Sequence, residues 1–454
     1  MDKSMAGDIE SVLMQLKGVL ARSTVVAALG GLLFGFDTAV IAGATQALTR
    51  IFGLSAESLG LTVASALLGT ILGSMLAGWP GERYGRRDSL KWMAVLYFAC
   101  AVGCALAWDW NSLVFFRFVG GLAVGGSSVL GPMYISEIAP ARLRGRLVGF
   151  FQFNIVLGIL LAYLSNYIIG TFGLGDSEWR WKLGVQAVPA LLFFVMLNTI
   201  PRSPRWLASK GRDAEALATL AAVGEPAPEA ELAEIKASLH QEDASGEALF
   251  QRRYRMPLYL AVSIAIFNQL SGINAVLYYL NDIFAKAGFD KVSGDLQAVS
   301  VGATNLVFTV LAMSVIDKAG RKTLLLIGSV GTSLCLGGIA AIFLSGQHQD
   351  KLVWLLAGFT GFFAFSQGAV IWVYISEVFP NRVRAKGQSL GSFTHWFMNA
   401  IVAGTFPLMA EKSGGYPFLF FSAMMALQFF VVLLTYPETK GVTLEQMQRK
   451  LGVD

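Results

Sequence analysis

Two charged side chains stand inside long apolar stretches of this chain, where ionised groups are rare. Asp37 lies in LGGLLFGFDTAVIAG and Arg117 lies in LVFFRFVGG. A charge at membrane depth costs several kcal/mol, so such residues are candidates for function. If both stretches span a membrane, Asp37 lies about 14 residues into the first span and Arg117 about six into the fourth, which runs the other way, at ~1.5 Å per residue. Both then lie roughly 9 Å from the same surface of a ~30 Å core, so they can be neighbours.

A buried carboxylate beside a guanidinium has two plausible roles. The pair can be a permanent ion pair that holds two helices together. Alternatively it can be a proton switch, because a carboxylate near arginine stays ionised, whereas a buried carboxylate without its partner takes a proton. We favour the switch, so the substitution Asp37→Asn is expected to abolish accumulation and proton uptake while sparing exchange.

A second group of residues has the chemistry to bind a hydroxyl-rich, uncharged ligand. The seventh apolar stretch, IFNQLSGINAVLYYLNDIF, is interrupted by amides and tyrosines. An amide both donates and accepts hydrogen bonds, as a sugar hydroxyl does, although amides also join helices within membranes. For His395, we favour contact with the ligand over a role as a proton relay. The candidate ligand-contacting residues are Phe34, Gln152, Asn268, Gln269, Asn274, Tyr278, Asn305, Trp372, His395, Trp396 and Asn399.

Charged residues also cluster in one set of alternate loops. They either fix the orientation of the chain in the membrane or form a latch between two halves of the protein. Single surface ion pairs contribute about 0–1 kcal/mol, but several acting together can shift a two-state equilibrium. On the latch hypothesis, Glu137→Gln or Arg384→Ala is expected to alter the ratio of inward to outward states. The gating candidates are Glu82, Arg83, Arg86, Arg87, Glu137, Arg142, Arg144, Asp317, Arg321, Glu377, Arg382 and Arg384.

The composition indicates that most of the chain lies in a membrane. Of 454 residues, 55% are hydrophobic and 14% are charged, whereas soluble proteins carry about 25% charged residues. The net charge of +5 comes from short loops beside apolar stretches and does not indicate nucleic-acid binding. We predict an all-α membrane protein with twelve transmembrane helices, over 22–47, 58–80, 89–107, 112–136, 147–169, 182–200, 256–285, 295–317, 323–345, 352–376, 387–410 and 416–436.

The loops indicate both orientation and domain organisation. Basic loops face the cytoplasm by the positive-inside rule, which places both termini there, while the opposite loops are short and nearly balanced in charge. One long polar stretch, broken at Pro226 and Pro228, is expected to form short amphipathic helices. We predict a six-helix bundle over 1–200, linker helices over 201–255, a second six-helix bundle over 256–437 and a cytoplasmic tail over 438–454.

An internal repeat relates the two predicted bundles. YISEIAPARLRGR (134–146) recurs as YISEVFPNRVRAK (374–386), 240 positions later. GWPGERYGRR (78–87) and SVIDKAGRK (314–322) align at an offset of 235. Both halves therefore run in the same direction, which is the arrangement of the two parallel halves of major facilitators.

Taken together, these motifs resemble the sugar porter family of the major facilitator superfamily. Three further motifs support the resemblance: PRSPRWL (201–207), NQLSGINAVLYY and PETKGVTLEQM (437–447). The resemblance implies alternating access and a hexose or pentose substrate. It matches Asp37 and Arg117 to the proton-coupling pair of bacterial sugar–proton symporters. The chain departs from the family at Asn268 and Arg202, where glutamine and glutamate are usual, and at His395, where Asn or Gln is common. The sugar-contacting positions matched are Gln152, Gln269, Asn274, Asn305 and Trp372.

These observations lead to one favoured function and two alternatives. We expect proton-coupled import of a monosaccharide across a bacterial inner membrane, by one chain acting as a monomer. An uncoupled sugar facilitator and a membrane sugar sensor that does not transport are the alternatives. The sequence shows no nucleophile–base set, nucleotide-binding loop or metal cluster, so we expect neither an enzyme nor a cofactor or metal.

Overall fold

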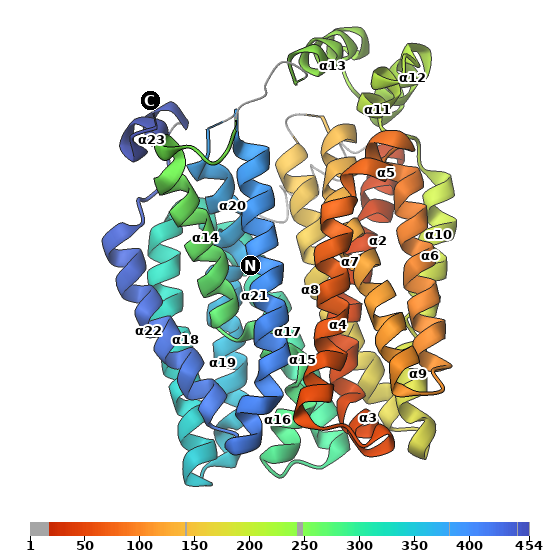
Figure 1. Ribbon diagram of the computed structural model, residues 1–454. Helices are drawn as coiled ribbons and strands as arrows, with labels where there is room; N and C mark the ends of the chain where they lie inside the picture. The colour runs from red at the N-terminus through yellow and green to blue at the C-terminus, as the bar shows by residue number, and fades with distance from the viewer. Residues whose placement is uncertain (1–17, 141–142, 243–247, 381, 443, 454) are drawn as a thin grey trace, which may run out of the picture.

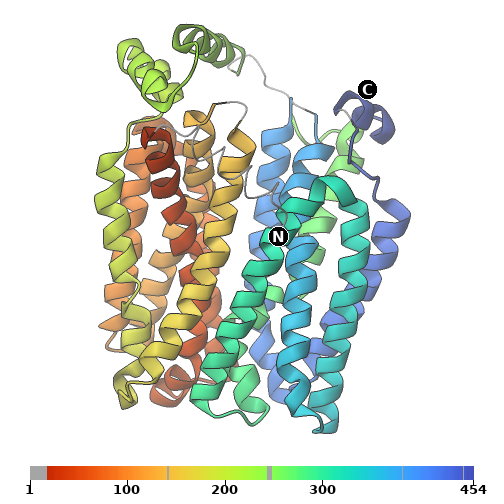
Figure 2. The same ribbon diagram turned by 180° about the vertical axis from the view of Figure 1, so that it is seen from behind.

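A computed structural model describes residues 18–140, 143–242, 248–380, 382–442 and 444–453. Within these residues the chain is built from helices, and they form two bundles that stand side by side (Figures 1 and 2). The long helices of the first bundle, called here the N half, are α2 (Gly18–Val40), α4 (Ala56–Leu76), α6 (Arg86–Ala105), α7 (Trp110–Ile138), α8 (Arg144–Gly170) and the pair α9 (Glu178–Gly184) and α10 (Ala187–Met196). Its short helices are η1 (Ile41–Gly43), α3 (Thr45–Phe52), α5 (Gly78–Arg83), η2 (Gly175–Ser177) and η3 (Leu197–Thr199).

The second bundle, the C half, repeats this plan. Its long elements are α14 (Arg255–Leu270) with α15 (Ile273–Tyr278) and α16 (Leu280–Lys286), α17 (Lys291–Ala319), α18 (Arg321–Ser345), α19 (Leu352–Phe365) with α20 (Gln367–Val378), α21 (Arg384–Lys412) and α22 (Tyr416–Thr435). Two short turns, η4 (Arg252–Tyr254) and η5 (Gln349–Lys351), precede α14 and α19.

Eleven helical segments of the described chain are long and apolar enough to cross a membrane. The twelfth, α21, has 29 residues but contains His395 and Asn399, whose polar side chains lower its mean hydropathy. The helix packs against α4 of the N half and α14 of its own half. The predicted all-α fold with twelve transmembrane helices is thereby confirmed.

Local sequence signals set where the helices begin and end. Asp109 caps α7, since its carboxylate accepts from Ser112 N at 2.8 Å and the Ser112 hydroxyl accepts from Asp109 N at 3.2 Å. Ser55 caps α4, since its hydroxyl accepts from Ser58 N at 3.2 Å. The seventh span, expected over 256–285, is not one helix, because Gly272 has a φ of +80° and separates α14 from α15. The break brings backbone groups and amide side chains to the middle of the bundle.

Four short helices lie at one end of the molecule, which we call the linker end (Figure 1). They are α11 (Pro204–Ser209), α12 (Asp213–Val223) and α13 (Pro228–Glu242) between the halves, and α23 (Leu444–Leu451) near the C-terminus. A small apolar core that includes Trp206, Leu220 and Ile235 holds the first three together. The expected short helices between the bundles are present, and Pro228 begins the last of them.

The hydrophobic core differs between the two ends of the molecule. Towards the linker end, each half has its own cluster, one around Tyr134 and Ile135 and the other around Tyr374 and Ile375. Towards the opposite end, a single cluster joins both halves, with side chains from α2, α8 and α9 packed with those from α15, α16 and α21. The halves are therefore joined by apolar packing at the end away from the linker.

Candidate substrate and coupling site

Asp37 and Arg117 lie in contact between α2 and α7. Arg117 Nη1 donates to Asp37 Oδ1 at 3.2 Å, and each side chain is only 3% exposed. The thiol of Cys100 on α6 lies 4.0 Å from the same carboxylate oxygen. Arg117 Nε is buried without a hydrogen-bond partner among the described residues. A buried ion pair with an unsatisfied donor is costly to maintain, which suits a pair that exchanges partners during a cycle.

The amides of the seventh span form a chain of hydrogen bonds beside the Gly272 break. Asn274 Nδ2 donates to Gln269 Oε1 at 3.0 Å, and Gln269 Nε2 donates to Asn268 Oδ1 at 3.2 Å. Because the break ends α14, side chains on either side of it converge instead of following one helical spiral. The three amides together present donors and acceptors within a buried site.

His395 on α21 faces this amide chain. Gln269 Nε2 lies 3.2 Å from its Nδ1 and 3.1 Å from its Nε2. The ring is flanked by Trp372 and Trp396, each with its centroid 5.1 Å away. A hydrogen bond from the amide requires an unprotonated ring nitrogen as acceptor. The geometry is that of a neutral, hydrogen-bonding imidazole held between two indoles.

Aromatic and amide residues extend the group toward the N half. The rings of Phe34 on α2 and Trp396 have centroids 5.5 Å apart, so they join the two halves near the middle of the molecule. Asn399 Nδ2 donates to the Tyr278 hydroxyl at 3.2 Å. Trp372 remains 38% exposed although it contacts the buried His395.

Two other predicted contact residues lie on a different pair of helices. Gln152 is half-buried on α8, and Asn305 is buried on α17. These two helices pack against each other across the two halves. They place one amide group from each half along the boundary between the halves, which we call the seam.

The charges of the N half at the linker end pair with one another. Arg86 Nη2 lies 2.9 Å from Glu137 Oε1, and Arg86 also donates to the carbonyl of Gly81. The Ser203 hydroxyl donates to the other oxygen of Glu137, and the Tyr134 hydroxyl donates to the carbonyl of Pro201 at 2.8 Å. Residues from α5, α6, α7 and the start of the linker are thus joined within one half.

The C half repeats this network residue by residue. Arg321 Nη2 lies 2.9 Å from Glu377 Oε1, and Arg321 donates to the carbonyl of Ile316. The Thr439 hydroxyl donates to Glu377, and the Tyr374 hydroxyl donates to the carbonyl of Pro437. The glycines that precede the two arginines, Gly85 and Gly320, share a φ of +92°, so the sequence repeat is also a structural repeat.

The other gating candidates have local surroundings. The Asp317 carboxylate contacts Arg321 at 3.0 Å, and the Glu82 carbonyl accepts from the Trp206 indole. Arg142 lies outside the described residues. The remaining members lie as follows: Arg83 over the rings of Trp79 and Tyr84, Arg87 beside Asp88, Arg384 near the Phe379 carbonyl, and Arg144 and Arg382 exposed.

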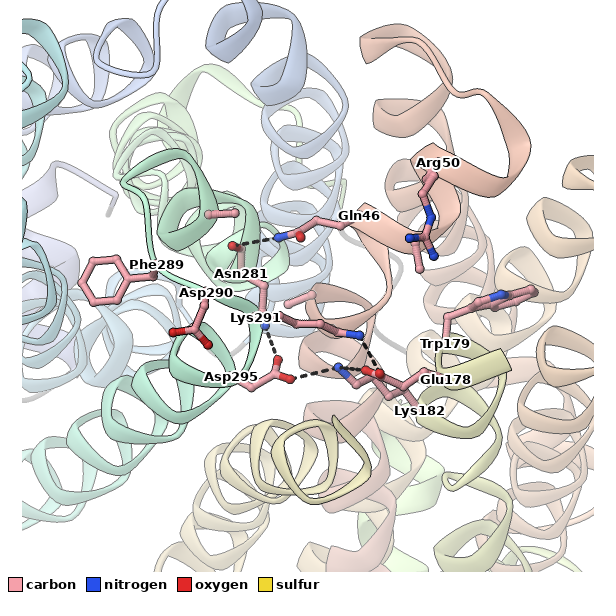
Figure 3. A pocket seen from close by; sticks show the side chains of 15 residues that line it. Gln46, Arg50, Glu178, Trp179, Lys182, Asn281, Phe289, Asp290, Lys291 and Asp295 are labelled. Atoms are coloured by element: carbon pink, nitrogen blue, oxygen red, sulfur yellow. Dashed lines mark hydrogen bonds and ion pairs between the residues drawn. The ribbon is translucent and has the colours of Figure 1, made fainter. Parts of the chain in front are cut away.

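A polar cluster at the opposite end was not found by sequence reasoning. Lys182 on α9 contacts Asp295 on α17 at 3.0 Å, and so joins the two halves (Figure 3). The predicted spans 182–200 and 295–317 begin at these two residues. A signal was available, because both residues fall within predicted helices, where an unpaired charge is rare.

Comparison with known proteins decides the family. A family model described as "Sugar (and other) transporter" matches residues 23–451. The chain belongs to this sugar transporter family. It is 38% identical to the D-xylose-proton symporter of Escherichia coli K12, with 94% of each chain covered. It is 36% identical to the arabinose-proton symporter of Bacillus subtilis, with 95% of each covered. The resemblance inferred from the motifs is confirmed.

Solved structures give the same result for the fold. The inward open conformation of the xylose transporter XylE from E. coli matches with a TM-score of 0.85 and 36% identity, over 95% of this chain and 99% of that one. A structure of XylE bound to 6-bromo-6-deoxy-D-glucose matches with a TM-score of 0.79 and 37% identity, over 95% and 99%. This sugar transporter therefore has the major facilitator fold of XylE, and of the two it is more similar to the inward open form.

Proposed function

We propose that this protein imports a monosaccharide together with a proton by alternating access. The observation that carries the proposal is the buried contact between Asp37 and Arg117 in a chain of the sugar transporter family. Charged side chains at membrane depth are costly and are therefore candidates for function. Relatives named as proton symporters for xylose and arabinose support the coupling to protons.

The linker end is proposed to be cytoplasmic, because the basic loops lie there. The opposite end is then the outer end. Apolar packing joins the halves at the outer end, whereas each half has a separate core at the linker end. We therefore assign the described conformation as inward-facing. Both termini are placed in the cytoplasm of a bacterium, the membrane is its inner membrane, and one chain supplies both halves of the pathway.

The sugar is proposed to bind between the halves, at the amide chain of the seventh span. Gln269 and Asn274 offer paired donors and acceptors to its hydroxyls. The accessible face of Trp372 packs against the C–H face of the ring. His395 presents a rigid imidazole in this site, and Asn268 reaches one methylene less far than the glutamine usual in the family. These two residues are expected to select among sugars that differ in one hydroxyl or one CH₂OH group.

Proton coupling is proposed to reside in the exchange of partners at Asp37. Both members of the pair belong to the N half, so rocking of two rigid halves does not by itself separate them. Separation requires α2 to move relative to α7. In the outward-facing state, protonated Asp37 and bound sugar together permit the change to the inward-facing state. There the proton leaves, and the carboxylate pairs with Arg117 as described.

The experiment that tests this proposal uses purified protein in liposomes. A counterflow panel of xylose, glucose, galactose and arabinose identifies the sugar that is carried. Addition of that sugar outside de-energised vesicles should alkalinise the medium as protons enter with it. Counterflow without alkalinisation would identify an uncoupled facilitator. Binding without counterflow would identify a sensor.

A further inference from the structure

Four charged side chains form one cluster between the halves at the outer end. Lys182 Nζ lies 2.8 Å from Glu178 Oε1 and 3.0 Å from Asp295 Oδ2. Lys291 Nζ lies 2.5 Å from the other oxygen of Glu178. Glu178 and Lys182 belong to α9 of the N half, whereas Lys291 and Asp295 belong to α17 of the C half. Figure 3 shows the two lysines pointing across the seam toward the two carboxylates.

Further contacts from the C half surround the cluster. Asn281 on α16 donates its amide to Asp295 Oδ1 and accepts, through its main-chain carbonyl, from Gln46 of the N half at 3.1 Å. Gly170 at the end of α8 leaves room for this arrangement, since a Cβ there would lie 2.8 Å from Asp295 Oδ2. Helices from both halves therefore converge on one carboxylate.

The burial of these groups is unusual for charged residues. Lys182 is 0% exposed, Asp295 1% and Glu178 4%. Lysine and the acidic residues are almost never fully buried unless they are paired. Two positive and two negative charges neutralise each other here. The pairs Lys182–Asp295 and Lys291–Glu178 each join the two halves, so they form only while the halves are in contact at this end.

We propose that Glu178, Lys182, Lys291 and Asp295 form a charge clasp that holds the outer end closed and thereby favours the inward-facing state. The proposal rests on the alternating access proposed above. Opening of the outer end must separate Lys182 from Asp295 and Lys291 from Glu178, because each pair has one member in each half. These four residues line a cavity of about 260 Å³ at the seam, and a water molecule occupies about 30 Å³ of liquid. Water can thus enter as the pairs separate, which makes the clasp reversible.

The four charges are not equivalent in this clasp. Removal of Lys182 alone leaves Asp295 buried without its cation and Glu178 with one cation instead of two, which penalises the closed outer end strongly. Removal of Lys182 and Asp295 together leaves the neutral pair of Lys291 and Glu178 in place. The double variant is therefore expected to close better than the single variant, a pattern that loss of packing alone does not produce.

The test measures the separation of the halves at the outer end by pulsed electron paramagnetic resonance. Spin labels are attached to cysteines that replace the exposed residues Thr171 in the N half and Gln349 in the C half, with the partly exposed Cys335 replaced by alanine. Lys182→Met should raise the ratio of long to short distances at least about tenfold, the effect of 1.4 kcal/mol. Lys182→Met combined with Asp295→Leu should reverse part of this shift.

Arg50→Ala is the matched control for this measurement. Arg50 forms an ion pair with Asp176 at the same end of the molecule, but both residues belong to the N half and their side chains are 68% and 83% exposed. The control should leave the distance distribution unchanged. If Lys182→Met behaves as Arg50→Ala does, the clasp is refuted.

A milder variant keeps the test decisive if the buried lysine is needed for folding. Lys291 is 52% exposed, so Lys291→Met should leave the core undisturbed while it removes the second contact across the seam. It should shift the distances in the same direction by a smaller factor, and an unchanged distribution would again refute the clasp. The distances are recorded without sugar or a proton gradient, so they test the clasp independently of counterflow, which tests the proposed function.

Discussion

The two ends of this transporter use charge in opposite ways. At the linker end, Arg86 pairs with Glu137 inside the N half and Arg321 pairs with Glu377 inside the C half. At the outer end, Lys182 pairs with Asp295 across the seam. When the halves rock as rigid bodies, each of these linker-end pairs moves with its own half and is equally present in both facing states. The pair that crosses the seam must break when the outer end opens, so it stabilises one state and not the other and shifts the equilibrium between them.

The two linker-end networks also differ from each other at one position. The Glu438 carboxylate follows Pro437 and accepts from the backbone N–H groups of Arg321 and Lys322, where α18 begins. The residue that follows Pro201 in the N half is Arg202, which instead contacts Asp88 in the first turn of α6 at 2.8 Å. An acid thus lies at the start of each helix, supplied by the tail in one half and by the helix itself in the other.

The largest effect is expected for the buried pair that lies within one half yet is proposed to change partners. Asp37→Asn removes the group that is proposed to take the proton. Accumulation of sugar and proton uptake should fall at least about tenfold, while exchange between equal pools is retained. Accumulation by this variant at the level of the natural protein would mean that the pair only joins α2 to α7, as Arg86 and Glu137 join their helices.

An intermediate effect is expected for the linker-end pairs. Glu137 is 8% exposed, so Glu137→Gln should lower the stability of the N half by about 1–3 kcal/mol, as loss of a buried charged hydrogen bond does. Since its partners belong to the same half, we expect little change in the ratio of inward to outward states. Thermal unfolding and outer-end distances measured on the same sample separate the two effects. A shift in the distances would instead support the latch between halves that the sequence suggested.

Glu377→Gln is the matched variant in the C half and should give the same pattern of lowered stability and unchanged distances. A different result in the two halves would show that the repeated networks do not contribute equally to the stability of their halves.

A smaller effect is expected from exchanging the residue that distinguishes the two networks. Arg202→Glu places a carboxylate beside Asp88, and both positions are partly exposed, so the cost should be within about 1 kcal/mol. Adding Asp88→Asn should remove the repulsion and restore the unfolding temperature. If the single variant were already as stable as the natural protein, the new glutamate would be capping α6 as Glu438 caps α18.

The smallest effect is expected from acidification at the tail. Burial alone would raise the pKa of Glu438, but its hydrogen bonds from four backbone N–H groups hold the pKa below its ordinary value of 4.5. A lowered pKa in the folded state gives stabilisation that is present above the ordinary value and is lost as pH falls through the folded value. Unfolding of the natural protein should therefore depend on pH below about 4.5 more steeply than that of Glu438→Gln. Parallel profiles for the two proteins would contradict this.

Much of the fold follows from the sequence because it depends on local pattern. Apolar runs long enough to span a membrane, basic loops and a repeat at an offset of 240 indicate twelve helices in two parallel halves. The depth of Asp37 and Arg117 in their spans was sufficient to place them near each other, and they lie in contact. Helical rise is regular enough for such an estimate.

The remainder depends on packing between halves, which no local pattern records. Lys182 and Asp295 are 113 residues apart and stand in different halves. Neither belongs to a repeated motif, so the duplication did not draw attention to them. The break at Gly272 could be suspected from the glycine, but its left-handed conformation and the convergence of Gln269 on His395 depend on the helices packed around it.

The most direct test of proton-coupled sugar import is accumulation in liposomes under an imposed gradient. With the outside one pH unit more acidic and the membrane potential clamped, one proton carried with each sugar should concentrate the sugar up to about tenfold inside, since one pH unit corresponds to about 1.4 kcal/mol. Collapse of the gradient should release the accumulated sugar. Sugar that equilibrates readily but never exceeds its outside concentration would contradict coupling through Asp37 and leave passive facilitation.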